Sequence, residues 1–88
     1  MHYVYIIYSK KNDKIYKGSS QDLKTRFNDH NSGKVLSTKN GIPWLLVYYE
    51  AFSNKKDARR EEIFLKSGKG RDRIKYLLES TLKKIDET

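Results

Sequence analysis

Cysteine is absent from the 88-residue chain, and proline, methionine and tryptophan occur once each. The absence of cysteine excludes disulfide bonds and thiolate metal sites, and it suits a reducing compartment. No apolar run approaches the roughly 18 residues that a membrane-spanning helix needs. Residues 1–5 enter a strand-like pattern at once, without the basic segment and cleavage site of a secretory signal. We therefore expect a cytoplasmic protein that makes no use of a membrane.

Positive charge is abundant. The 19 lysines and arginines stand against 11 aspartates and glutamates, which gives a formal net charge of +8. Such an excess on a short chain favours a polyanionic partner, most often nucleic acid. Charge alone leaves a merely soluble basic surface as an almost equal alternative. The basic residues are spread over the whole chain, which argues against a peripheral membrane protein.

The residue pattern predicts one domain over residues 1–85 with elements in the order β-β-α-β-α-α. Strands are expected at residues 3–9, 14–19 and 44–52, and helices at residues 22–31, from 53 or 54 to about 67, and after Gly70. The apolar run 44–49 favours a strand in the middle of the sheet. The last three residues, 86–88, are expected to fray.

The first two strands place two tyrosines together. A two-residue turn at residues 12–13 would pair Lys11 with Lys14 and put Tyr5 and Tyr16 on the same face of the hairpin. A shift of the register by one residue would separate them, so the expectation can be tested. Taken singly, either tyrosine is more often a core aromatic.

The first helix adds basic groups beside the core. One side of it carries Leu23, Arg26, Phe27 and His30. Because the two apolar residues must pack inward, Arg26 and His30 are expected at the edge of the core. An ordinary ion pair with Asp22 or Asp29 is the simpler alternative for each.

The second helix adds a carboxylate. Glu62 lies on the apolar stripe of this helix, with Glu61 on its flank, so at least one carboxylate is directed at the sheet. Burial there is costly without a partner. Neutralisation of Glu62 by Arg59 or Lys66 on the same helix is the simpler alternative.

Together these groups match the needs of phosphodiester hydrolysis. A carboxylate can hold a hard divalent cation that keeps several waters. A guanidinium binds phosphate oxygens in pairs, and a tyrosine becomes a more accessible base near positive charge. Other chemistries are poorly supplied, because the chain has no cysteine and only two histidines. Residues 67–70 lack the spacing of a phosphate-binding Walker loop and are expected to be an interhelical turn.

Four segments resemble the GIY-YIG nuclease superfamily. Residues 3–7 (Tyr-Val-Tyr-Ile-Ile) and 15–19 (Ile-Tyr-Lys-Gly-Ser) are similar to its two signature strands. Residues 22–34 resemble the helix that carries its arginine, and residues 58–66 the helix with its metal-binding glutamate. The resemblance covers about residues 2–80 and is strongest to the small stand-alone bacterial branch related to the N-terminal nuclease domain of the excision-repair incision subunit.

The resemblance implies an α+β fold, a three-stranded antiparallel sheet flanked by helices, and metal-dependent cleavage of one DNA strand per active site, in DNA repair or recombination. It implies Tyr5 as general base, with Tyr16 assisting it or positioning water. Arg26 would clamp the scissile phosphate, and His30 would aid proton transfer or bind phosphate. Glu62 would bind a single Mg²⁺ or Mn²⁺. We expect the tyrosine hydroxyls, Arg26 and Glu62 to border one concave surface.

The sequence also departs from the family pattern. Lys17 follows Tyr16 and is expected on the opposite face of its strand, and the apolar Ile74 stands where several members have asparagine. We expect no appended DNA-recognition domain, so affinity for DNA should come mainly from phosphate contacts. A catalytically weak binding module and a subunit that needs a protein partner are the alternative functions. Monomer and weak dimer both stay open.

Overall fold

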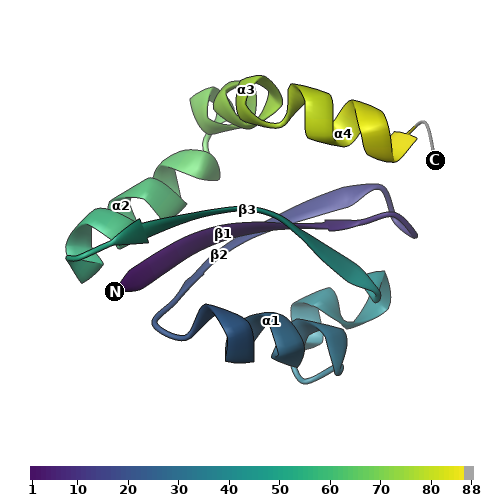
Figure 1. Cartoon of the computed structure of the whole chain (residues 1–88), viewed down its shortest axis with the longest axis horizontal. Helices are drawn as coiled ribbons and strands as arrows, with labels where there is room; N and C mark the ends of the chain where they lie inside the picture. The colour runs from purple at the N-terminus through teal and green to yellow at the C-terminus, as the bar shows by residue number, and fades with distance from the viewer. Residues whose placement is uncertain (87–88) are drawn as a thin grey trace.

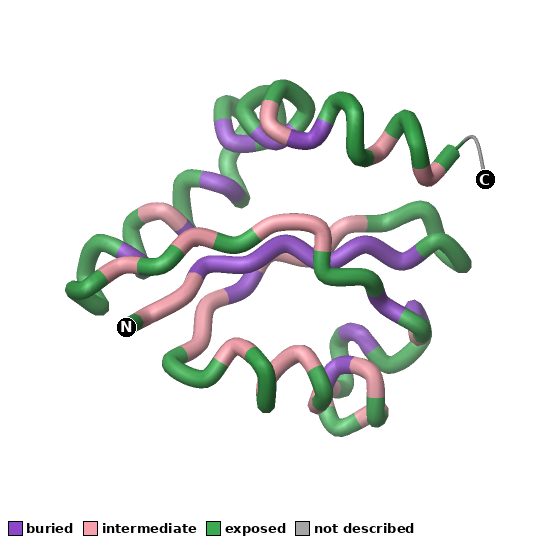
Figure 2. Tube along the Cα trace, in the orientation of Figure 1, coloured by how far each residue is buried: buried purple, intermediate pink, exposed green. Residues whose placement is uncertain are grey.

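Three strands form one antiparallel sheet in the computed structural model, which describes residues 1–86. They are β1 (His2–Ser9), β2 (Lys14–Ser20) and β3 (Trp44–Phe52), in the order β2-β1-β3. Figure 2 shows that burial is concentrated along β1, the strand that is paired on both sides. The position expected for β3 in the middle of the sheet is therefore wrong, because β1 takes it and leaves β3 at an edge.

Helices cover both faces of the sheet (Figure 1). On one face lie α1 (Leu23–Asn31) and the short 3₁₀ helix η1 (Leu36–Gly41), and on the other lie α2 (Lys55–Leu65), α3 (Gly68–Leu77) and α4 (Glu79–Asp86). The expected α+β class and order of strands are confirmed. Within residues 1–86 no helix combines the length and the apolar character that crossing a membrane requires.

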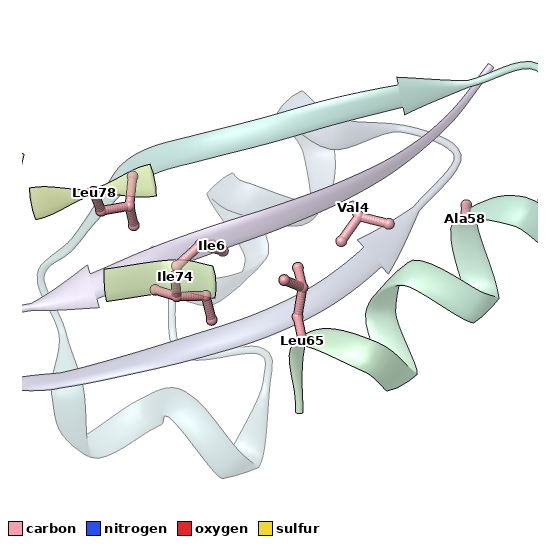
Figure 3. Packing of buried hydrophobic residues seen from close by; sticks show 6 residues of the cluster. All are labelled: Val4, Ile6, Ala58, Leu65, Ile74 and Leu78. Carbon is pink, nitrogen blue, oxygen red and sulfur yellow. The ribbon is translucent and has the colours of Figure 1, made fainter. Parts of the chain in front are cut away.

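The alternation of side chains along β1 divides the core into two parts. Even-numbered residues of β1 pack against α2 and α3, in the cluster Val4, Ile6, Ala58, Leu65, Ile74 and Leu78 (Figure 3). Odd-numbered residues pack towards α1, in the cluster Tyr5, Ile7 and Trp44 with Tyr16, Leu23, Phe27 and Ile42 around it. The two tyrosines that the sequence singled out therefore belong to the α1 face.

The hairpin between β1 and β2 has a longer turn than expected. Ser9 pairs with Lys14, and Tyr5 with Gly18, so the predicted pairing of Lys11 with Lys14 is wrong by two residues. Residues 10–13 form the loop, in which Asp13 adopts a φ of 52° and accepts a hydrogen bond of 2.8 Å from the Tyr8 hydroxyl. An even shift preserves the faces. Tyr5 and Tyr16 therefore do lie on one face.

Most helix ends follow their sequence signals. Asp22 caps α1 by accepting from the Thr25 amide at 3.1 Å, and Gly33 follows the helix with a φ of 81°. Asn54 caps α2 in the same way.

The C-terminal helices differ from expectation. The third helix begins at Gly68, capped by Ser67, rather than after Gly70, so residues 67–70 are not simply a turn. Gly70 is buried against the backbone of Phe64 and Leu65. The single helix expected after Gly70 is two helices, because α3 ends at Leu77 and α4 begins at Glu79. Asp86 belongs to α4, and the rest of the expected frayed end lies outside the described residues.

A β-bulge interrupts β3. Tyr48 pairs with Ile6 but Leu46 pairs with Ile7, so Val47 is the extra residue between them. Strict alternation would put Leu46 and Tyr49 on opposite faces. Because of the bulge, both lie on the α1 face.

Candidate active site

A buried hydrogen-bonded chain links β1, α1 and η1. The Tyr5 hydroxyl lies 2.7 Å from Nε2 of His30, and Nδ1 of His30 lies 2.7 Å from Oγ1 of Thr38. Thr38 in turn can donate to the carbonyl oxygen of Val35 at 3.4 Å. When Thr38 donates its one hydroxyl proton to Val35, its oxygen accepts from Nδ1–H of His30. Nε2 of His30 then has no proton and accepts from the Tyr5 hydroxyl.

Gly18 provides the space in which the Tyr5 hydroxyl lies. A Cβ at this position of β2 would stand 2.5 Å from the Tyr5 hydroxyl oxygen and 3.1 Å from the ring of Tyr16. The Tyr16 ring also packs edge-on against His30, with the centroids 5.1 Å apart. Tyr5 is 1% exposed and His30 is 0% exposed, whereas Tyr16 is half-buried. Tyr16 is therefore the tyrosine of the pair that solvent can reach.

Arg26 completes the group on the α1 face. Its guanidinium lies near enough to the Tyr5 hydroxyl to lower its pKa, as its position one turn before His30 allows. Among residues 1–86 it forms no ion pair within 4.0 Å. The alternative partners are occupied elsewhere, because Asp22 caps α1 and Asp29 faces Lys34 at 3.9 Å. The half-buried guanidinium is free to bind a phosphate.

The surroundings hold Tyr5 and His30 in their neutral forms. Burial raises the pKa of Tyr5 to about 12, a change that the nearby Arg26 guanidinium opposes and the charge of Glu62 reinforces. Burial and the charge of Arg26 lower the pKa of His30, against a smaller opposing effect of Asp29. In this environment, Tyr5 loses its proton less readily than a free tyrosine.

Glu62 approaches β2 from the other face. The Ser19 hydroxyl donates to its Oε1 at 2.7 Å, Lys66 donates to Oε2 at 2.9 Å, and Arg59 lies 3.7 Å away. Burial works to raise the pKa of Glu62, but the hydrogen bonds from Lys66 and Ser19 outweigh it and hold the pKa below its usual value. Glu62 is 8% exposed and ionised. The simpler alternative, neutralisation by Arg59 and Lys66, is thus part of the structure.

The sheet separates Glu62 from the tyrosines. Ser19 pairs with Val4 and so belongs to the α2 face, whereas its neighbour Gly18 pairs with Tyr5 on the α1 face. Glu62 therefore does not share a face of the sheet with Tyr5, Tyr16 and Arg26. The two halves meet only at the free edge of β2, where Glu62 still influences the pKa of Tyr5.

The structure also decides the expectations for His30, Ile74 and Lys17. His30 is enclosed, so direct binding of phosphate by its ring is excluded in this conformation. Ile74 is 2% exposed in the core and supplies no polar ligand. Lys17 pairs with Ile6, which confirms that it faces away from Tyr16. Burial, followed by the charges of Arg71 and Lys66, lowers the pKa of Lys17.

The residues near Glu62 fit a weakly held, largely hydrated cation. They offer one carboxylate and the Ser19 hydroxyl, both hard oxygen donors. Residues 1–86 contain no group of three or more acidic, histidine or cysteine side chains placed to share a metal ion. Mg²⁺ usually keeps several waters and needs one or two carboxylates. A cation here would compete with the ammonium group of Lys66.

Two polar residues escaped the sequence reasoning. Thr38 lies in a segment expected to be a loop, and nothing local marks it as the partner of His30. Ser19 stands in a signature-like strand, but only the packing of α2 on the sheet brings it to Glu62. Alternation along β2 could have indicated its face, since Gly18 and Ser19 must point in opposite directions.

Fold and side-chain cluster agree with a known domain. The family model described as "GIY-YIG catalytic domain" matches residues 1–84. The chain therefore belongs to the GIY-YIG family, a nuclease domain family.

Within that family, the chain is similar to UPF0213 proteins, which are small bacterial proteins. A UPF0213 protein of Staphylococcus haemolyticus is 38% identical over 79 residues, which cover 89% of this chain and 95% of the relative. One from Clostridium perfringens is 31% identical, with 94% and 89% covered. The solution NMR structure of a UPF0213 protein from Bacillus halodurans superposes with a TM-score of 0.55 at 34% identity, and covers 86% of this chain and 83% of that one.

Proposed function

We propose that the protein is a metal-dependent endonuclease that hydrolyses DNA phosphodiesters at the free edge of β2. The observation that carries the proposal is the meeting of two clusters at Gly18 and Ser19. One contains two tyrosines beside an arginine that has no acidic partner in the described part of the chain, and the other contains an ionised glutamate. Membership of a nuclease domain family and the net charge of +8 support the choice of substrate. Cytoplasmic DNA repair or recombination is the setting that we propose.

The accessible groups on the α1 face contact the substrate. Arg26 binds the non-bridging oxygens of the scissile phosphate and balances the charge that develops on them. Tyr16 accepts a hydrogen bond from the attacking water and then, as phenolate, its proton. The water oxygen forms the new bond to phosphorus while the bond to the leaving oxygen breaks, and solvent returns a proton to that oxygen.

The buried pair acts indirectly. Tyr5 is enclosed and has a pKa of about 12, so we assign it a positioning role instead of the role of general base. Its hydroxyl lies beside the Arg26 guanidinium, and His30 fixes the orientation of that hydroxyl. The chain Tyr5–His30–Thr38 thereby holds the guanidinium at the β2 edge.

Glu62, assisted by Ser19, would hold the divalent cation, Mg²⁺ or Mn²⁺. When bound, such a cation supplies Lewis-acid charge to the phosphate and lowers the pKa of its water. Lys66 must release Oε2 of Glu62 for this to occur, because it donates to that oxygen at 2.9 Å. Lys66 is half-exposed and can turn to solvent, and the divalent cation would replace its positive charge beside the buried Glu62.

A plasmid-nicking assay with Mg²⁺ or Mn²⁺ tests the proposal. We expect wild type to nick supercoiled DNA and Glu62→Gln and Tyr16→Phe each to lose about 10²-fold or more of the rate, the scale of a general-base contribution. Tyr5→Phe should lose less than Tyr16→Phe. Glu79→Gln, on exposed α4, is the matched acidic control.

Equal nicking by wild type and Glu62→Gln would assign the cleavage to contamination. A larger loss for Tyr5→Phe than for Tyr16→Phe would restore Tyr5 as the base.

A DNA-binding module with little catalysis is the second candidate. It is favoured by the Lys66 and Ser19 hydrogen bonds that occupy Glu62 and by the apolar core position of Ile74. Binding of DNA by wild type without nicking in either metal would select it. Nicking that appears only after a second protein is added would select the partner-dependent subunit.

A further inference from the structure

The apolar run of β3 is only partly buried, although its composition favours the interior. Leu45, Leu46 and Tyr49 are 49%, 37% and 55% exposed. Two of them, Leu46 and Tyr49, line a groove of about 560 Å³ between the sheet and α1, together with Tyr3, Leu23, Phe27 and Lys24. The bulge at Val47 is what places these two on the α1 face together.

The groove lies on the same face of the sheet as the tyrosines of the candidate active site. Tyr49 pairs directly with Tyr5, which pairs on its other side with Gly18, so these three residues form one row across the sheet. Along α1, Phe27 in the wall of the groove follows Arg26 in the chain. A strand of DNA whose phosphate lies at Arg26 can therefore reach this groove by crossing α1.

The walls of the groove suit a flat aromatic ligand. The rings of Tyr3 and Tyr49 meet edge-on, with centroids 6.1 Å apart and planes at 63°, and Tyr49 is more than half exposed. The exposed tyrosine surface can stack on a nucleobase, which every base permits through its π face. Leucine and phenylalanine side chains line the remainder, and the volume is ample for a base with its sugar.

The charges around the groove favour a nucleotide over a neutral apolar partner. Lys24 lines it and Arg26 follows on the same helix, and within residues 1–86 neither forms an ion pair within 4.0 Å. The one acidic lining residue, Asp22, is engaged by the Thr25 amide at 3.1 Å and the Thr25 hydroxyl at 2.9 Å. The free charges at the groove are thus cationic and match flanking phosphates.

We propose that this groove binds an unpaired base of the DNA strand that is cut, stacked on Tyr49. The inference rests on the proposed function for its choice of DNA, and it adds a substrate class: strands with unpaired bases beside the scissile phosphate. A base inside a duplex presents no free face to Tyr49, so fully paired DNA gains nothing from the groove.

Binding in EDTA tests this without any need for cleavage. Fluorescence anisotropy of a labelled single-stranded dT oligonucleotide and of a duplex of equal length would be measured for wild type and variants. Tyr49→Ala should weaken binding of the single strand about tenfold, the scale of one lost stacked base. Its binding to the duplex should change by less than about twofold, because phosphate contacts are kept.

Matched variants separate stacking from general damage. Tyr49→Phe keeps the ring and should retain the wild-type preference for single strands. Tyr76→Ala removes a tyrosine of α3 that is even more accessible, 75% exposed on the other side of the sheet, and should leave both affinities unchanged.

Several results would overturn the proposal. They are equal losses for Tyr49→Ala and Tyr76→Ala, equal losses on single strand and duplex, and no binding of the single strand by wild type. Sedimentation that shows a wild-type dimer lost in Tyr49→Ala, with DNA binding unchanged, would assign the groove to a second copy of the chain. Failure of the nuclease proposal is recognised separately, because a protein that never nicks DNA can still show the single-strand preference.

Discussion

Two clusters of reactive side chains reach the β2 edge from opposite faces of the sheet, and they differ in charge and in exposure. On the α1 face, Tyr5 and His30 are enclosed, hydrogen-bonded and neutral. On the α2 face, Glu62 is ionised, and the side chains of its partners Lys66 and Arg59 are 50% and 68% exposed. Neutral polar groups can be buried once their hydrogen bonds are made, whereas a buried charge needs partners that keep access to water.

From this difference we expect the two faces to contribute unequally to stability and to catalysis. The α1 cluster should hold its members in place and contribute to the stability of the fold, and the α2 cluster should hold charge for chemistry and contribute little to stability. Arg26 belongs to the first cluster by position but is half-buried and has no acidic partner among residues 1–86. A substitution of Arg26 is therefore the strongest test of whether the two clusters differ in this way.

The largest effect is expected for Arg26→Ala. Loss of the phosphate clamp should lower the nicking rate about 10²- to 10³-fold, as for removal of one transition-state donor. The free energy of unfolding should fall by less than about 1 kcal/mol, because no ion pair is lost. Nicking kinetics and urea denaturation measure the two quantities, with Arg60→Ala, which breaks only an exposed pair with Asp57, as the control. Unchanged nicking would remove Arg26 from the site.

The second-largest expected effect is a loss of stability in His30→Ala. His30→Ala leaves the Tyr5 hydroxyl and Thr38 without their partner and creates a cavity, so it should cost about 3 kcal/mol of unfolding free energy. His2→Ala, near the start of β1, should cost less than about 0.5 kcal/mol. Urea denaturation of both variants provides the comparison. Similar losses would mean that the α1 cluster is not a structural unit.

A smaller loss is expected for Gly18→Ala. The added methyl group would meet the Tyr5 hydroxyl 2.5 Å away, so Tyr5 must shift, at about 1–2 kcal/mol. Gly68→Ala meets nothing within 4 Å and should be neutral or slightly stabilising in its helix. Thermal denaturation of the pair distinguishes crowding from the general effect of replacing glycine.

The smallest effect is a pH dependence with two opposing parts. The pKa of His30 is lower in the folded protein than in the unfolded chain. As the pH drops, the unfolded chain therefore binds a proton before the folded protein does, and the free energy of unfolding falls below the unfolded pKa near 6.5. On the α2 face, a hydrogen bond with Glu50 and, second to it, burial raise the pKa of Glu61 to about 7. The contribution of Glu61 to the free energy of unfolding is therefore lost as the pH rises from about 4.5 to 7.

Two variants separate these parts in urea denaturation between pH 5 and 7. Relative to wild type, His30→Gln should remove the acid-side loss, and Glu61→Gln should remove the loss towards pH 7. An unchanged slope in His30→Gln would show that His30 keeps its ordinary titration in the folded protein.

Local signals predicted the elements well, and the reasons are visible in single residues. Asp22 and Gly33 mark the ends of α1 by capping chemistry that needs no tertiary context. The face shared by Tyr5 and Tyr16 survived a wrong register because only an odd shift can separate two residues of a hairpin.

What the sequence could not provide is the order and layering of these elements. The apolar run of β3 reads as central, yet β1 takes that place because both neighbours pair with it. Periodicity directs Glu62 and Glu61 towards the sheet, but only the placement of α2 sends Glu62 to Ser19 of β2 and Glu61 to Glu50 of β3. The face on which a helix packs depends on the path of the chain between elements, which local patterns do not encode.

Because of the bulge at Val47, the number of residues in β3 matters as well as their identity. The two halves of the strand are out of phase by one residue, so substitutions along it leave each half facing its own layer. Deletion of Val47 itself would remove the extra residue and leave Leu46, Tyr48 and Tyr49 opposite their present partners. Deletion of a residue elsewhere in β3, with the bulge kept, would turn one half over. We therefore expect β3 to accept changes of side chain, and loss of Val47, more readily than insertions or deletions at its other positions.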